Sequence, residues 1–151
     1  MKIVVSACLM GEDCKYNGLD NYHRALVEAC EKTGTEVVLV CPEVFGGLPT
    51  PRTPAEIVDG VVRDREGRVV YRAFRMGARR ALDICEQQGG PDEIGLVVLQ
   101  DRSPSCGVGH IYDGTFSGSL TAGNGVFAQM AIERGYRVIP ASAFRADMLD
   151  G

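Results

Sequence analysis

The chain has 151 residues, of which 45% are hydrophobic, and this size and composition predict one globular domain over residues 1–151. The net charge is -4 and the Lys and Arg residues are dispersed, which argues against binding to a nucleic-acid duplex through its phosphates. No apolar run approaches the roughly 18 to 20 residues needed to span a membrane. We therefore expect a cytoplasmic protein that acts on a small molecule and has no membrane partner.

The N-terminal part of the chain reads as a β-α-β unit. Apolar patterning predicts a strand over residues 2–7, an amphipathic helix over 21–32 that is closed by Gly34, and a strand over 37–40. The next segment, CPEVFGGLPTPRTP, contains four prolines and two glycines. This composition predicts a stiff functional loop without regular structure.

The rest of the chain continues the alternation. Residues 57–63 and 68–71 are expected to form a β-hairpin that turns at 64–67. Helices are expected over 72–88 and 124–134, strands over 94–99 and 136–139, and a surface tail after Phe144. Strands that alternate with helices predict an α/β fold, here a Rossmann-like three-layer domain with a mainly parallel sheet and an inserted β-hairpin.

Three of the six cysteines follow apolar, β-branched runs. Cys8, Cys41 and Cys106 each lie in a loop just past such a run. Adjacent strands are about 4.8 Å apart, so loops that leave one edge of a parallel sheet can bring distant cysteines together. In a reducing compartment, such cysteines are more often metal ligands or reactive thiols than disulfides. The alternative is that small polarizable residues merely suit crowded strand ends.

The spacing of these cysteines favours a metal centre with an open position. Structural zinc sites use C-x2-C pairs and four closed ligands, and this chain has no such pair. Three thiolates from separate loops leave a fourth position free, as a catalytic metal or cluster requires.

The other three cysteines have different interpretations. Cys30 and Cys85 fall on the apolar stripes of predicted helices and are expected to be buried as small hydrophobes. Cys14 lies six residues after Cys8 and could be a fourth ligand, a sulfur-accepting thiol or an ordinary loop cysteine. It is left out of the predicted ligand set.

Several polar residues flank the three cysteines. Glu43 follows Cys41 closely and is suited to general acid or base catalysis, although it could be an exposed loop carboxylate. Ser103 and Ser105 precede Cys106 and offer hydroxyl groups to a substrate, or form a serine turn. The TAGNG segment could bind an anion through its amide groups.

Three sequence blocks, VSACLMGEDCKYNG, CPEVFGGLPTPR and LQDRSPSCG, together with GNGVFAQ, resemble the thiouracil desulfidase family over nearly the whole chain. The resemblance implies a 4Fe-4S cluster held by Cys8, Cys41 and Cys106, with one iron left open for the sulfur of a thiolated pyrimidine. It also implies Glu43 as the acid/base group and Ser103 as a polar substrate contact.

The reaction implied by this resemblance is non-redox desulfuration. A thiolated pyrimidine such as 2-thiouracil, or a related base or nucleoside, would be converted to the oxo compound with release of sulfide, by a carbon-sulfur lyase or hydrolase. Two other classes of protein could use the same thiolates. One is a different zinc or cluster enzyme, such as a sulfur carrier in which Cys14 forms a persulfide. The other is a non-catalytic iron-sulfur or zinc-binding regulatory module.

Overall fold

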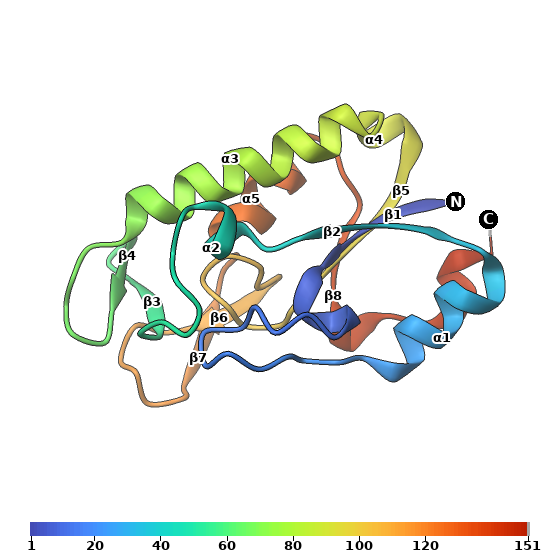
Figure 1. Cartoon of the computed structure of the whole chain (residues 1–151). Coiled ribbons are helices and arrows are strands. Elements are labelled where there is room, and N and C mark those ends of the chain that lie inside the picture. The colour runs from blue at the N-terminus through green and yellow to red at the C-terminus, as the bar shows by residue number, and fades with distance from the viewer. Residues whose placement is uncertain (151) are drawn as a thin grey trace.

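A parallel sheet forms the centre of the computed structural model, which describes residues 1–150 (Figure 1). Its strands are β1 (Lys2–Ser6), β2 (Glu36–Val40), β5 (Ile94–Leu99) and β8 (Val138–Pro140). They pair in the order β2-β1-β5-β8, and every pair is parallel. The mainly parallel sheet is therefore confirmed. The predicted single domain extends to Gly151, which lies outside the described residues.

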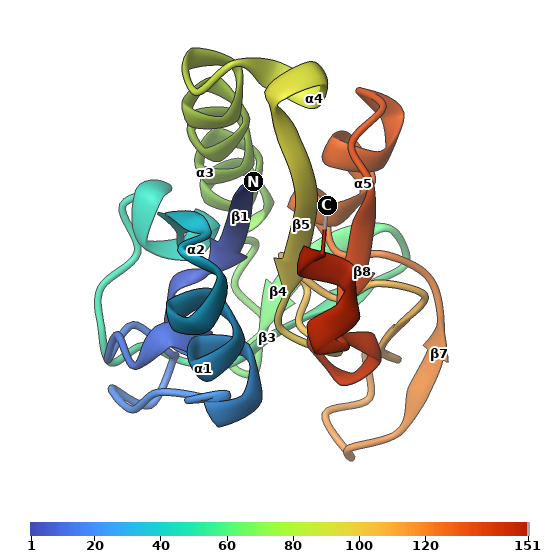
Figure 2. The ribbon, with the colours of Figure 1, turned by 90° about the vertical axis from the view of Figure 1, so that its right-hand side faces the viewer.

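Helices cover both faces of this sheet (Figures 1 and 2). The helix α1 (Arg24–Thr33) packs on one face, and α3 (Tyr71–Gln87) and α5 (Val126–Glu133) pack on the other. Strand β1 alternates between the two cores, because Ile3 and Val5 lie on the α1 side and Val4 on the α3 side. This is the predicted three-layer α/β arrangement. The shorter helices are α2 (Pro42–Phe45), α4 (Gly90–Glu93) and the 3-10 helices η1 (Ala7–Met10), η2 (Ala141–Ala143) and η3 (Ala146–Leu149).

The predicted hairpin is present, and an additional turn that was not predicted precedes it. Strands β3 (Ala55–Val58) and β4 (Val61–Asp64) pair antiparallel around Asp59 and Gly60, both of which have positive φ. The expected turn at 64–67 also exists, since Gly67 N–H donates to the Asp64 carbonyl at 2.9 Å, and Arg63 and Val69 form an antiparallel bridge across it. The prediction thus located this turn and missed the earlier one, which divides the strand expected over 57–63.

A second hairpin was not predicted. Strands β6 (His110–Tyr112) and β7 (Leu120–Ala122) pair antiparallel between β5 and α5. All three residues of β7 are exposed, so its sequence shows no alternation between buried and exposed positions. Both hairpins lie at the end of the molecule opposite the N-terminus (Figure 1).

Two further expectations are wrong. The segment after Cys41 is not wholly irregular, because Pro42 occupies the first turn of α2, where a missing N–H costs no hydrogen bond. The tail after Phe144 is not simply surface, because Leu149 in η3 is buried in the core beside α1. No helix among the described residues is long and apolar enough to span a membrane.

Candidate active site

A cavity of about 340 Å³ lies at the carboxyl ends of the central strands, and four cysteines line it. Cys8, Cys41 and Cys106 come from the segments that follow β1, β2 and β5, which are neighbours in the sheet. The chain leaves β1 toward α1 on one face and β5 toward α5 on the other, and this divergence opens a crevice. The structure thus brings the three predicted cysteines to one place.

Cys8 lies in η1, and the following loop holds it in place. The Asn21 backbone N–H donates to the Cys8 carbonyl at 3.0 Å, and the Asn21 side-chain amide lies 3.6 Å from the Cys8 sulfur. A hydrogen bond from the Cys14 thiol lowers the pKa of Cys8, and Asn21 acts in the same direction. Burial and the nearby Cys41 oppose this shift.

Cys41 is the N-cap residue of α2. Its pKa is lowered to about 7, first by a hydrogen bond from the Cys14 thiol and then by the Val44 N–H and the Arg52 charge. Burial and the Glu43 carboxylate oppose the shift. A substantial fraction of Cys41 is therefore thiolate at neutral pH, which is the form that binds soft metals.

Cys106 is the most deeply placed of the three. Burial raises the pKa of its thiol to about 12, although hydrogen bonds from Ser6 and Ser105 favour the thiolate. Its backbone N–H donates to the Ser103 hydroxyl at 2.8 Å. The Ser105 hydroxyl lies 3.7 Å from its sulfur. A cation in the cavity would be needed to hold Cys106 as a thiolate.

The loop that carries Cys106 is fastened to the start of α5. Val126 N–H donates to the Pro104 carbonyl at 2.8 Å, and Phe127 N–H to the Ser105 carbonyl at 2.9 Å. Gly125 permits this approach, because a Cβ there would lie 2.4 Å from the Ser105 carbonyl carbon. Within the TAGNG segment, Gly123 N–H donates to the Gly109 carbonyl at 3.1 Å and Gly125 N–H to the Gly107 carbonyl at 2.8 Å, so the chain itself occupies these two amides.

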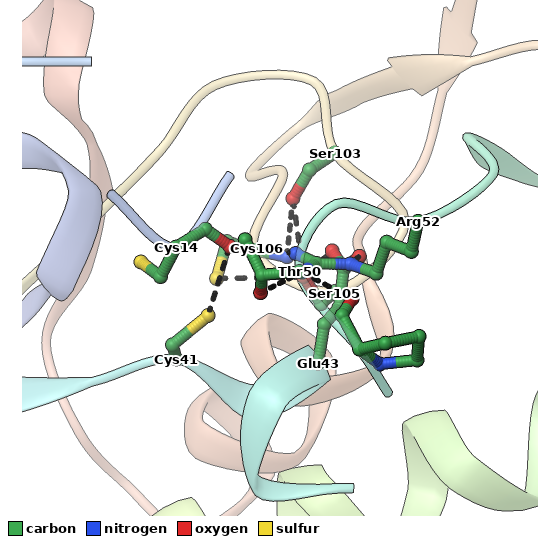
Figure 3. Close-up of polar contacts among 9 residues, drawn as sticks. Cys14, Cys41, Glu43, Thr50, Arg52, Ser103, Ser105 and Cys106 are labelled. Atoms are coloured by element: carbon green, nitrogen blue, oxygen red, sulfur yellow. Dashed lines mark hydrogen bonds and ion pairs between the residues drawn. The ribbon is translucent and has the colours of Figure 1, made fainter. Parts of the chain in front are cut away.

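Glu43 belongs to a buried polar network in the same cavity (Figure 3). Its Oε1 accepts a hydrogen bond from Arg52 Nε at 3.0 Å, and its Oε2 accepts one from the Ser105 hydroxyl at 2.8 Å. The two side chains of this ion pair are only 16% and 7% exposed, respectively. Ser103 lies next to the network, with its hydroxyl 3.3 Å from that of Ser105. Glu43 is therefore not an exposed loop carboxylate.

Arg52 was not among the predicted site residues, yet it lies at the centre of this network. Its Nη2 donates to the Cys14 carbonyl at 2.9 Å and its Nη1 to Thr50 Oγ1 at 3.0 Å, so one guanidinium joins the Cys14 loop, the proline-rich loop and Glu43. The available signal was an arginine placed between prolines nine residues after Glu43. Such a residue is shielded by a rigid loop and can be held in one orientation.

Cys14 also belongs to the cavity. Its thiol lies between the sulfurs of Cys41 and Cys8, and sharing its hydrogen with them raises the pKa of Cys14. Its backbone carbonyl accepts a hydrogen bond from the Cys41 thiol at 3.8 Å. Cys30 and Cys85 are buried in helices away from the cavity, as predicted. His110 is exposed on β6 and is not among the residues that line the cavity.

The donor set fits an iron-sulfur cluster by its chemistry. Soft thiolates are the usual cluster ligands, and each binds a different iron, so the cysteines need only face a common space. Within residues 1–150, no three His, Cys, Asp or Glu side chains converge closely enough to enclose a single metal ion.

A parallel α/β domain with thiols from three neighbouring strands around one cavity defines a class of proteins that can hold a soft-metal centre at the sheet edge. The sequence model of the 2-thiouracil desulfurase family matches residues 3–142. The chain therefore belongs to the 2-thiouracil desulfurase family.

Two relatives extend this assignment. The chain is similar to the uncharacterized protein YbbK of Bacillus subtilis (strain 168), with 39% identity over 149 residues that cover 91% of this chain and 93% of YbbK. It is also similar to a solved structure of the 4Fe-4S-dependent thiouracil desulfidase TudS, with a TM-score of 0.84 and 39% identity. That match covers 93% of this chain and 91% of TudS. The α/β fold and the recognised family are thus confirmed.

Proposed function

We propose that this protein removes sulfur from a thiolated pyrimidine, 2-thiouracil or a related base or nucleoside, in the cytoplasm. The products are the oxo compound and sulfide. The observation that carries the proposal is the cavity in which Cys8, Cys41 and Cys106 surround the same space as the Glu43 network. Membership of the 2-thiouracil desulfurase family supports it.

A 4Fe-4S cluster is the cofactor in this proposal, and Cys8, Cys41 and Cys106 would hold it. When bound, a cluster with three protein ligands supplies one soft Lewis-acidic iron that polarises the thiocarbonyl group. The low pKa of Cys41 favours the thiolate needed for ligation. The similarity to 4Fe-4S-dependent TudS supports the choice of cluster over zinc.

Glu43 is the proposed acid/base group. Its carboxylate takes a proton from the water that attacks the thiocarbonyl carbon and returns it to the departing sulfur. Water supplies the oxygen of the product, hydrogen sulfide carries away the sulfur, and no electrons are gained or lost. Arg52 and Ser105 fix both carboxylate oxygens, so the proton is exchanged at a defined place. Ser103, next to Ser105, would donate its hydroxyl hydrogen to the substrate.

The test is anaerobic purification followed by iron analysis and sulfide release from 2-thiouracil. We expect about four irons per chain and sulfide production in the wild type. Glu43→Gln can keep hydrogen bonds to Arg52 and Ser105, so it should retain the iron but lose about 100-fold or more in kcat. Glu66→Gln, on an exposed turn, is the control and should match the wild type.

Other results would contradict the proposal. A wild type that binds iron but releases no sulfide from 2-thiouracil or 2-thiouridine would point to a regulatory module. Full activity in Glu43→Gln would remove the proposed role of Glu43 while leaving the reaction in place.

A further inference from the structure

Glu56 is a buried carboxylate that the proposed reaction does not use. Four polar or charged residues are buried among those described: Ser6, Glu56, Asp64 and Ser105. Ser6 and Ser105 contact Cys106, and Asp64 pairs with Arg68. Glu56 is 8% exposed and lies on β3, in the wall of the cavity that the hairpins form.

One oxygen of Glu56 holds the loop between β6 and β7. Its Oε1 accepts hydrogen bonds from the backbone N–H groups of Gly114 at 2.9 Å and Phe116 at 3.1 Å. Gly114 has a positive φ, and a Cβ there would lie 2.7 Å from the Ile57 carbonyl oxygen. The loop is thus held against β3, and Glu56, Phe116 and Tyr112 all line the cavity.

The other oxygen of Glu56 has no protein donor in the described part of the chain. Every protein hydrogen bond to this side chain goes to Oε1, and Glu56 forms no ion pair there. Tyr136 Oη is the one fully enclosed side-chain oxygen or nitrogen without a partner in residues 1–150. Oε2 of Glu56 is therefore not fully enclosed, and Glu56 is one of the residues that line the cavity.

We propose that Glu56 Oε2 accepts a hydrogen bond from the substrate, so that Glu56 determines which thiolated compounds bind. This inference rests on the proposed function. Thiouracil carries ring N–H groups and a thiolated nucleoside adds sugar hydroxyls, and both are donors that a carboxylate oxygen can accept. Tyr112 and Phe116 line the same cavity and offer aromatic rings against which a pyrimidine can pack.

The test compares wild type with Glu56→Gln. The glutamine carbonyl can still accept the two loop N–H groups, but its NH₂ group replaces the free oxygen and opposes a substrate donor. We expect the Kd to rise by about tenfold or more, measured by rapid ultrafiltration of cluster-loaded protein, with Glu43→Gln present in both samples to slow turnover of the ligand. Iron content and hydrogen exchange of residues 113–119 should stay unchanged.

Two ligands identify the donor. If Glu56→Gln raises the Kd for 2-thiouracil, Glu56 recognises a ring N–H. If it raises the Kd for 2-thiouridine alone, Glu56 recognises a sugar hydroxyl. Glu66→Gln, which changes an exposed carboxylate on the neighbouring turn, should bind both ligands like the wild type.

The outcomes separate this inference from the proposed function. If the wild type releases sulfide and Glu56→Gln binds both ligands unchanged, the role of Glu56 is overturned and the proposed reaction stands. If Glu56→Gln alters exchange of residues 113–119 as much as Glu56→Ala does, Glu56 only holds the loop, and the inference is again overturned. If the wild type neither binds nor desulfurates either ligand, both proposals fail.

Discussion

Arg52 shows how much one side chain contributes to this site. Its partner Glu43 is only 16% exposed, so removal of the guanidinium leaves a buried carboxylate without its cation. We expect Arg52→Met to lower the free energy of unfolding by about 3 kcal/mol, measured by urea denaturation of the metal-free protein. Arg145→Met is the control, because Arg145 pairs with Asp147 in an exposed ion pair, and its loss should cost about 1 kcal/mol or less. Equal losses in the two variants would show that the buried pair gives no special stability.

Cys41 should react before Cys106 in the metal-free protein. The pKa of Cys41 is about 7 and that of Cys106 is about 12, so of these two cysteines only Cys41 is largely thiolate just above neutral pH. Brief iodoacetamide treatment followed by mass spectrometry measures the order in which the two cysteines are alkylated. Cys14→Ala removes the hydrogen bond that stabilises the Cys41 thiolate. The pH at which the alkylation rate of Cys41 is half its maximum should therefore rise toward about 8.5. An unchanged midpoint would contradict this role of Cys14.

At the level of elements, the position of α2 depends on two glycines. A Cβ on Gly77 of α3 would collide with the Pro42 carbonyl oxygen and lie 2.7 Å from Gly46 N, and a Cβ on Gly46 would collide with the Ala73 carbonyl oxygen. Because α2 carries Glu43, this close contact with α3 fixes the depth of the carboxylate in the cavity.

Gly77→Ala tests this contact. The added methyl group must push α2 away from α3, so the free energy of unfolding should fall by about 1 to 3 kcal/mol in a urea titration. Arg79→Ala changes an exposed position on the same helix and should shift stability by no more than about 0.5 kcal/mol. If Gly77→Ala is as stable as the wild type, α2 has room to move and its depth is not fixed by the glycine.

Elements with strong local patterns were predictable from the sequence. The apolar run of β5 gave its bounds, and the amphipathic pattern of α3 gave its helix to within one residue at each end. The hairpin β6–β7 was not predictable, because its strands are three residues long and β7 is wholly exposed.

In the cavity, the clustering of Cys8, Cys41 and Cys106 was predicted from the strand ends. The partners of Glu43 were not, because Arg52 and Ser105 reach it only through tertiary folding.

At the scale of the whole molecule, a cluster bound by Cys8, Cys41 and Cys106 would join the ends of three adjacent strands. A cofactor that binds only the folded chain stabilises it, by about 2.7 kcal/mol at a hundredfold excess over Kd. For a chain of this size, roughly 2 to 4 °C per kcal/mol applies, so cluster removal should lower the Tm by about 5 to 10 °C. Anaerobic calorimetry before and after chelation measures this shift. Cys106→Ser would lack one of the proposed ligands. Its Tm should therefore be the same before and after cluster reconstitution, whatever that Tm is. Equal Tm values for the loaded and stripped wild type would mean that the thiols do not cross-link the sheet edge through a cofactor.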